Sequence, residues 1–150
     1  MVFEHRLVAA VAAPGVVDVS ASWTAPLPGS LVRQLDAGDR DGFTKGMRTA
    51  ERLPDIRRTL EFRARPSGIR DRFDLYRAVR EYRLDQAQAA AIRTPLLLTD
   101  PEGEQFWPSQ SARLAGMLPG AEVVRFTAAE GASGHCEPMA RLLVEQQVFD

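Results

Sequence analysis

The chain has little of what marks several classes of protein. Its 150 residues include one cysteine, so no disulfide can form within the chain, which fits a reducing compartment. No apolar run approaches the roughly 20 residues that are needed to cross a bilayer, and the first residues lack the layout of a signal peptide. We therefore expect a cytoplasmic protein that does not interact with membranes.

An excess of charge of one sign is also lacking. The 19 Lys and Arg residues stand against 20 Asp and Glu residues, so the net charge of -1 gives no general attraction to nucleic acid. Residues 33–83 are nevertheless locally basic, with 14 Lys and Arg against 9 Asp and Glu, a net +5. Solvated helix faces explain this excess most simply, and the alternative is a surface for an anionic partner. Few aromatic residues lie among the arginines, so we expect no nucleic-acid partner.

Three short apolar segments predict β-strands, at residues 7–12, 95–99 and 122–126. The first two are near-continuous apolar runs, which are typical of parallel strands covered on both faces. Each segment is followed by loop residues and then by a helical pattern, the order of an α/β fold. The sequence thus predicts an α/β protein with about three parallel strands and flanking helices.

A long stretch without strand signals separates the first two predicted strands. Apolar residues recur there at helical spacing, so we interpret residues 30–91 as an all-helical insertion, either a lid over a site or a small subdomain. A further helix is predicted from Trp107 to about Leu118, with Pro108 in its first turn. A last helix is predicted to begin near Pro138 and to bury apolar side chains, namely Met139, Leu142 and Leu143.

Candidate chemistry lies in the two loops that follow the second and third predicted strands. His135 sits in a glycine-containing loop, and Glu104 sits in an acidic loop after the preceding strand. Open α/β sheets place their sites beyond the carboxyl ends of the strands, so both loops should open at one edge. A carboxylate that accepts the Nδ1 proton of a histidine fixes its tautomer. Taken singly, each loop has a simpler structural explanation: a surface or capping histidine for the His135 loop, and an acidic turn with first-turn charge for the Glu104 loop.

Together, the two loops resemble the carboxyl-terminal part of the α/β-hydrolase superfamily. The segment PLLLTDPEGEQFWP at 95–108 is similar to the family pattern P-x-L-x-x-x-G-x-x-[DE]-x-x-x-P, with Glu104 on the acid position. The family's histidine follows the last strand, as His135 does. The phrases EQFWP and GHCEP resemble bacterial dipeptidyl aminopeptidase and acylaminoacyl-peptidase-like proteins, including FrsA-like esterases. The resemblance implies that Glu104 is the triad acid and His135 the general base, without a metal or other cofactor.

Two parts of that family's site are absent from the sequence, the nucleophile and the oxyanion-hole segment that precedes it in the family. The nucleophile of the family lies in G-x-S-x-G, and no such pentapeptide occurs in the chain. Ser133, in GASGH, precedes the proposed base by two residues and is poorly placed to be its partner. We interpret Cys136, next to that base, and His5 as structural residues. We therefore expect no nucleophile within the 150 residues, and a chain that is inactive alone.

Other residues are weaker candidates for the same site. Asp100 is a minor rival for the acid position, and Asp18, after the first predicted strand, is another. Trp23 and Trp107 follow the first and second strands and are candidates to line a substrate pocket, although packing explains them as well.

The resemblance implies part of a serine hydrolase acting on a small-molecule ester, amide or ketone. The alternative is a non-catalytic binding or interaction module with the same fold. A nucleotide-binding domain is a poor third interpretation, because no G-x-G-x-x-G or Walker A run is present. The apolar segment Leu7–Ala12 would be an open sheet edge, so we also expect self-association through it.

Overall fold

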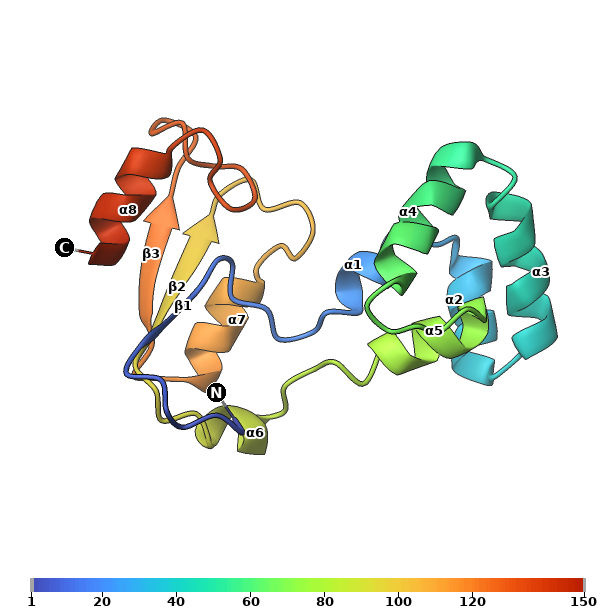
Figure 1. Ribbon diagram of the computed structural model, residues 1–150, viewed down its shortest axis with the longest axis horizontal. Helices are drawn as coiled ribbons and strands as arrows, with labels where there is room; N and C mark the ends of the chain where they lie inside the picture. The colour runs from blue at the N-terminus through green and yellow to red at the C-terminus, as the bar shows by residue number, and fades with distance from the viewer. Residues whose placement is uncertain (1, 150) are drawn as a thin grey trace. The chain divides into compact units, whose positions relative to one another are not determined.

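The computed structural model describes residues 2–149, which fold into two compact units. The sheet unit comprises residues 2–19 and 83–149, and the helical unit comprises Ser20–Tyr82. Among the described residues, three strands form one parallel sheet in the order β1-β2-β3 (Figure 1). Their bounds are β1 Ala10–Ala12, β2 Leu96–Pro101 and β3 Glu122–Phe126. The protein is therefore of the α/β class, as the apolar segments predict.

The sheet unit has its core between the sheet and two helices, α6 (Gln86–Ala90) and α7 (Gln110–Met117). The strands lie between α7 and the last helix, α8 (Arg141–Phe149), in Figure 1. Leu98 of β2 is fully buried, as is Ala89 of α6. The other fully packed members of this cluster are Val17, Leu96, Leu114 and Leu118. One apolar core thus fixes β2, the strand from which the Glu104 loop leaves.

Five helices build the helical unit, all within the described residues. Two of them begin at aspartates whose side chains accept a backbone N–H: Asp39 caps α3, and Asp71 caps α5. The unit's core is aromatic, since Phe43 makes edge contacts with Phe73 and Tyr76 at ring-centroid distances of 5.9 and 5.3 Å. The bounds are α1 Ala21–Thr24, α2 Gly29–Ala37, α3 Arg40–Ala50, α4 Pro54–Ala64 and α5 Arg72–Val79.

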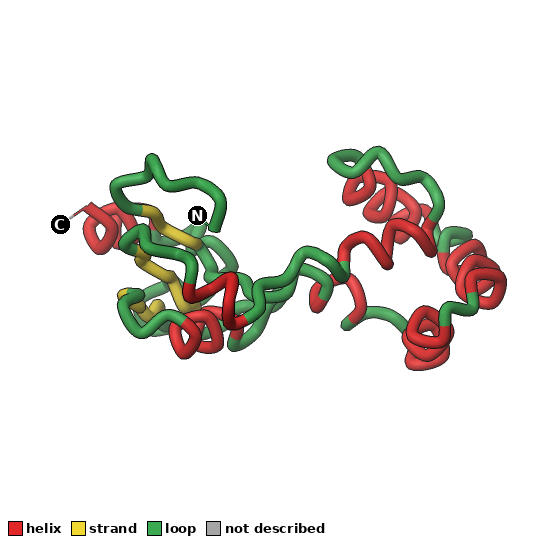
Figure 2. The backbone as a smooth tube through the Cα atoms, turned by 90° about the horizontal axis from the view of Figure 1, so that it is seen from below, coloured by secondary structure: helices red, strands yellow, loops and turns green. Residues whose placement is uncertain are grey.

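The helical unit differs in its bounds from the predicted insertion at 30–91. It runs from Ser20 to Tyr82, and the flanking residues Asp18 and Arg83 form an isolated antiparallel bridge within the sheet unit. Two loop segments connect the two units along the chain (Figure 2). Helix α6, which the prediction placed in the insertion, belongs to the sheet unit because Ala89 is buried in that unit's core. The short, alanine-rich sequence of α6 does not predict which of the two apolar cores the helix packs against.

Two of the predicted elements are wrong at their ends. In the segment 7–12, residues 10–12 alone pair with β2, and Val8 is 89% exposed. The last helix begins at Arg141 rather than near Pro138, because residues 134–140 form two turns closed by hydrogen bonds from Glu137 N and Ala140 N. Met139 and Leu142 are therefore exposed rather than buried.

The helix predicted from Trp107 also begins later, at Gln110. Ser109 adopts a left-handed conformation with φ of 64°, so Pro108 lies before the helix rather than in its first turn.

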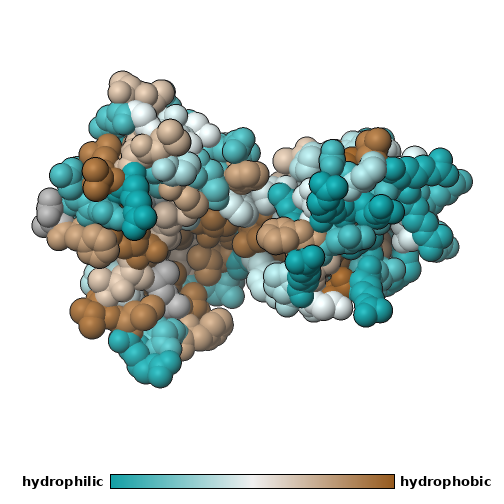
Figure 3. All heavy atoms as spheres, turned by 45° about the horizontal axis from the view of Figure 1, so that its top comes forward, coloured by the Kyte–Doolittle hydropathy of each residue, from teal (hydrophilic) through white to brown (hydrophobic). Residues whose placement is uncertain are grey.

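Apolar side chains are widespread on the face of the sheet unit that Figure 3 shows, whereas the helical unit is mostly hydrophilic on that face. Among residues 2–149, no helix combines the length and the apolar character needed to cross a membrane.

Self-association through β1 stays a prediction, and one substitution tests it. β1 is at the end of the sheet, and Val11 within it is 47% exposed. A lysine on an edge strand opposes pairing with a second chain. We expect Val11→Lys to shift the chain toward monomer in sedimentation velocity at high concentration, whereas Phe62→Lys, on exposed α4, should not. A wild-type chain that sediments as a monomer at the same concentration would contradict the prediction.

Candidate active site at the carboxyl ends of the strands

The two loops singled out in the sequence leave the sheet side by side. The loop after β2 and the loop after β3 both lie beyond the carboxyl ends of these parallel strands (Figure 1). Glu102 N donates to Phe126 O at 2.9 Å, and its carboxylate accepts from Ala128 N at 2.8 Å. Gly103 N donates to Ser133 O at 2.9 Å. Backbone contacts therefore tie the Glu104 loop to the His135 loop.

Gly103 is the residue that permits this close approach. A Cβ atom at this position would lie 2.8 Å from the carbonyl oxygen of Ser133, closer than a side-chain carbon comes to a backbone oxygen. Neither backbone can retreat freely, because both loops are held by the neighbouring strands. The glycine thus lets the acid and the histidine meet, a role that its place in the sequence pattern does not reveal.

Glu104 and His135 are brought into direct contact. Glu104 Oε2 lies 2.7 Å from His135 Nδ1, and Oε1 accepts hydrogen bonds from the backbone N–H groups of Phe106 at 2.7 Å and Trp107 at 3.1 Å. The Glu104 side chain is 5% exposed and the His135 side chain 25%. The geometric part of the prediction is met: the acid is held from three directions, and the imidazole keeps partial access to solvent.

The surroundings of Glu104 favour its charged form. Burial works in the opposite direction, but the hydrogen bonds from His135, Phe106 and Trp107 outweigh it and lower the pKa of the Glu104 carboxyl. An ionised Glu104 can only accept a hydrogen bond from Nδ1–H, so a neutral His135 carries its proton on Nδ1 and leaves the Nε2 lone pair free to accept another proton. This is the arrangement that a general base requires.

Two aromatic rings flank the imidazole. The Phe106 ring meets His135 edge-on at 4.9 Å, and the Trp107 ring lies 5.7 Å away at a tilt. Trp107 Nε1 donates to Val19 O at 3.3 Å, which fixes the indole. Trp107, one of the two candidates to line a substrate pocket, thus borders the imidazole. Trp23, its proposed companion, lies in the helical unit.

The rival acids take other partners. Asp100, still within β2, lies 3.8 Å from Arg125 of β3. Asp18 forms an isolated bridge with Arg83 within the sheet unit, and its backbone is held by the side chain of Gln110. Among these carboxylates, Glu104 is the one that contacts the imidazole.

The surroundings of Cys136 and Ser133, which lie close to His135 in the sequence, do not activate either residue as a nucleophile. Cys136 Sγ lies 3.2 Å from Ala13 O. Burial, reinforced by the nearby carboxylates of Glu137 and Glu104, raises the pKa of the thiol, so its neutral form is favoured. Ser133 is half-buried and uses its carbonyl oxygen to hold Gly103. In the described part of the chain, no group of three or more His, Cys, Asp or Glu side chains is placed to bind a metal ion.

Glu137 is a residue that the sequence reasoning missed. It is 1% exposed, and neither carboxyl oxygen has a hydrogen-bond partner in the described structure. The fully buried hydroxyl of Thr99 on β2 lies close enough to influence this carboxyl, but it falls short of hydrogen-bond geometry. Cys136 and Glu137 also have positive φ values, 58° and 44°, which are strained for residues with side chains. A glutamate in a polar loop normally faces solvent, so the sequence alone does not predict that Glu137 is buried.

Glu137 should make stability depend on pH. Burial raises the pKa of this carboxyl, so the folded chain binds its proton more tightly than the unfolded chain. The free energy of unfolding therefore falls as pH rises from the ordinary glutamate pKa of about 4.3. Glutamine cannot ionise, so we expect Glu137→Gln to gain about 1–3 kcal/mol over the wild type at neutral pH, with the gain vanishing near pH 4. Urea titrations across this pH range would measure it.

The matched control for this prediction is Glu122→Gln, which makes the same chemical change at an exposed position of β3. Its stability should follow that of the wild type at every pH. Equal pH profiles for Glu137→Gln and the wild type would show that folding does not raise the pKa of the Glu137 carboxyl.

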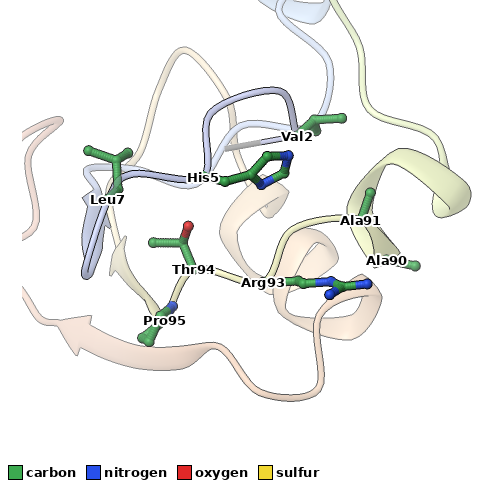
Figure 4. A pocket seen from close by; sticks show the side chains of 8 residues that line it. All are labelled: Val2, His5, Leu7, Ala90, Ala91, Arg93, Thr94 and Pro95. Carbon is green, nitrogen blue, oxygen red and sulfur yellow. The ribbon is translucent and has the colours of Figure 1, made fainter.

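A separate pocket lies at the opposite end of the sheet. It has a volume of about 530 Å³ and is lined by His5, Leu7, Arg93 and Pro95, among others (Figure 4). Pro95 directly precedes β2, so this pocket opens at the amino ends of the strands, away from Glu104 and His135. His5, which we interpreted as structural, is exposed at this pocket.

Comparison with protein-family models, with curated proteins and with solved structures gives no match for this chain.

Proposed function

We propose that this chain supplies the acid and the general base of a serine-hydrolase catalytic triad. In this proposal Glu104 is the acid and His135 the base, the sheet unit is the carboxyl-terminal part of an α/β-hydrolase domain, and the helical unit is its lid. The observation that carries the proposal is the 2.7 Å contact between Glu104 Oε2 and His135 Nδ1, reached from the ends of two neighbouring parallel strands. The low pKa of Glu104 adds support.

The proposed roles follow from the proton positions. His135 Nε2 would take the proton of a serine hydroxyl as that oxygen attacks the carbonyl carbon of an ester, an amide or a ketone. The same proton would then pass from Nε2 to the leaving group. Glu104, fixed by two backbone N–H groups, would hold the ring and stabilise the imidazolium formed between these steps.

The serine in this proposal lies outside the 150 residues. No G-x-S-x-G occurs in the sequence, and neither Ser133 nor Cys136 has the surroundings of an activated nucleophile. The chain alone should therefore react with no fluorophosphonate probe, which labels serines activated by a neighbouring base. Stoichiometric labelling of the 150-residue chain would contradict this part of the proposal.

The proposal as a whole is tested by the DNA immediately upstream of the first codon. An in-frame segment that encodes a strand followed by G-x-S-x-G would supply the missing group, and the protein expressed from that longer reading frame should hydrolyse simple aryl esters. The alternative is a non-catalytic binding module with the same fold. A stop codon and a promoter directly before the first codon would favour this alternative.

A further inference from the structure

The helical unit contains a groove that the hydrolase proposal does not use. It has a volume of about 1120 Å³ and is lined by residues of α4 and of the helices α2 and α3, all within Ser20–Tyr82. This volume slightly exceeds the range of most small-molecule sites, roughly 300–1,000 Å³. Its apolar lining includes the buried side chains of Trp23, Leu31, Met47, Leu60 and Tyr76.

The rim of the groove is also apolar. Leu53 and Ile56 line it and are 60% and 38% exposed. On the opposite wall, α2 and α3 approach closely at Gly46, where a Cβ atom would lie within 2.4 Å of the Leu31 side chain, so these two helices leave no space between themselves. The open volume therefore lies on the α4 side. The exposed apolar side chains at the rim, above a floor of packed apolar side chains, favour an apolar occupant.

The charges at the groove are not balanced. Its one carboxylate, Asp55, forms an ion pair with Arg58 at 3.5 Å. Among the described residues, neither Lys45 of α3 nor Arg63 of α4 has a carboxylate within ion-pair distance, and both line the groove. A partner that enters the groove thus meets apolar walls and two cations without counter-ions.

Arg63 is the better fixed of these two cations. Its guanidinium lies 5.4 Å from the centre of the Trp23 ring, and one of its nitrogens donates to Ser22 O at 3.3 Å. The side chain is half-buried. A guanidinium held in place by an aromatic ring keeps free N–H groups for a bidentate contact with a carboxylate, and it loses little conformational entropy when it makes that contact.

We propose that this groove binds an amphipathic anion, a molecule with one extended apolar chain and a single carboxylate. The apolar chain lies along Leu31, Met47 and Leu60, and the carboxylate pairs with Arg63. Lys45, on the other wall, adds attraction for the same charge. The site is formed by residues of the helical unit alone, so it stands or falls independently of the role of Glu104 and His135.

Three probes of equal chain length test the proposal on the full 150-residue chain. Dodecanoate, dodecanol and dodecyltrimethylammonium share the apolar chain and differ in head-group charge. In isothermal titration below their critical micelle concentrations, we expect dodecanoate to bind with a stoichiometry of one, and the ammonium ion to bind at least tenfold more weakly. Equal affinity for the anion and the cation would overturn the proposal, as would binding of several dodecanoate molecules without saturation.

Two variants test whether the carboxylate of the bound anion pairs with Arg63. Arg63→Gln keeps much of the side-chain stem and removes the charge, so it should weaken dodecanoate about tenfold and leave dodecanol unchanged. Arg57→Gln makes the same change on an exposed position of α4 outside the groove, and it should leave both ligands unchanged. If both variants weaken dodecanoate equally, the attraction is a general effect of basic charge and the assignment to Arg63 is wrong.

The groove itself is tested by filling it. Ala50→Phe places a ring at a lining position of α3, so it should weaken dodecanoate and dodecanol alike, with helix content checked by circular dichroism. The three-probe comparison on the wild type needs no variant and decides the proposal if Ala50→Phe fails to fold. If dodecanoate gives no heat of binding to the wild-type chain, the proposal is wrong whatever the oligomeric state of the chain.

Discussion

Replacing His135 by alanine should reduce hydrolysis by about 10⁶-fold in the protein that carries both this chain and a serine nucleophile. Replacing Glu104 by glutamine should reduce it by about 10⁴-fold, because the imidazole survives but loses its tautomer and its counter-charge. Both losses should fall on kcat rather than on KM, since neither side chain is expected to bind the ground-state substrate. Steady-state kinetics with an aryl ester would separate the two constants.

Asp100→Asn is the matched control for Glu104→Gln. Both variants neutralise a carboxylate near the end of β2: Asp100 lies within the strand, and Glu104 lies in the loop after it. Asp100 lies against Arg125 rather than the imidazole. It should keep kcat within a few-fold of the wild type. A loss at Asp100 as large as the loss at Glu104 would mean that the triad acid has been assigned to the wrong residue.

Phe43→Ala should destabilise the helical unit by about 3–5 kcal/mol. Phe43 is fully buried, and its ring contacts, to Phe73 and Tyr76, lie within the same unit. The chain has two tryptophans, and they report on different units: Trp23 is in the helical unit and Trp107 is in the sheet unit. Urea titrations of single-tryptophan variants, Trp107→Phe and Trp23→Phe, would follow each unit separately. The Trp23 transition should move to lower urea while the Trp107 transition stays in place.

Phe62→Ala is the control for this substitution. The Phe62 side chain is 67% exposed on α4, so its removal should change stability by less than about 0.5 kcal/mol. If Phe43→Ala moves both tryptophan transitions equally, the two units unfold as one cooperative body, and the division of the chain into separately stable units is wrong.

The sequence specified β2 and β3 well, because each is a short segment rich in apolar residues with loop residues after it. β3 has the predicted bounds, and β2 begins one residue after its predicted start and ends two residues beyond its predicted end. β1 is shorter than predicted, since apolar character at Leu7 and Val8 does not supply a hydrogen-bonding partner. The last helix starts late for a related reason: the hydrophobicity of Met139 and Leu142 predicts burial, but no core reaches them.

The sequence determined by itself which residues could form the candidate site, because strand order places the loops of Glu104 and His135 at one end of a parallel sheet. The tertiary structure alone decided that these side chains meet at 2.7 Å, that Gly103 makes room for the contact, and that Glu137 is buried without a partner. Patterns of polarity along a chain record what each residue prefers on average. Distances between loops and the desolvation of single carboxyl groups depend on atoms far apart in the sequence, and they are fixed only when the chain packs.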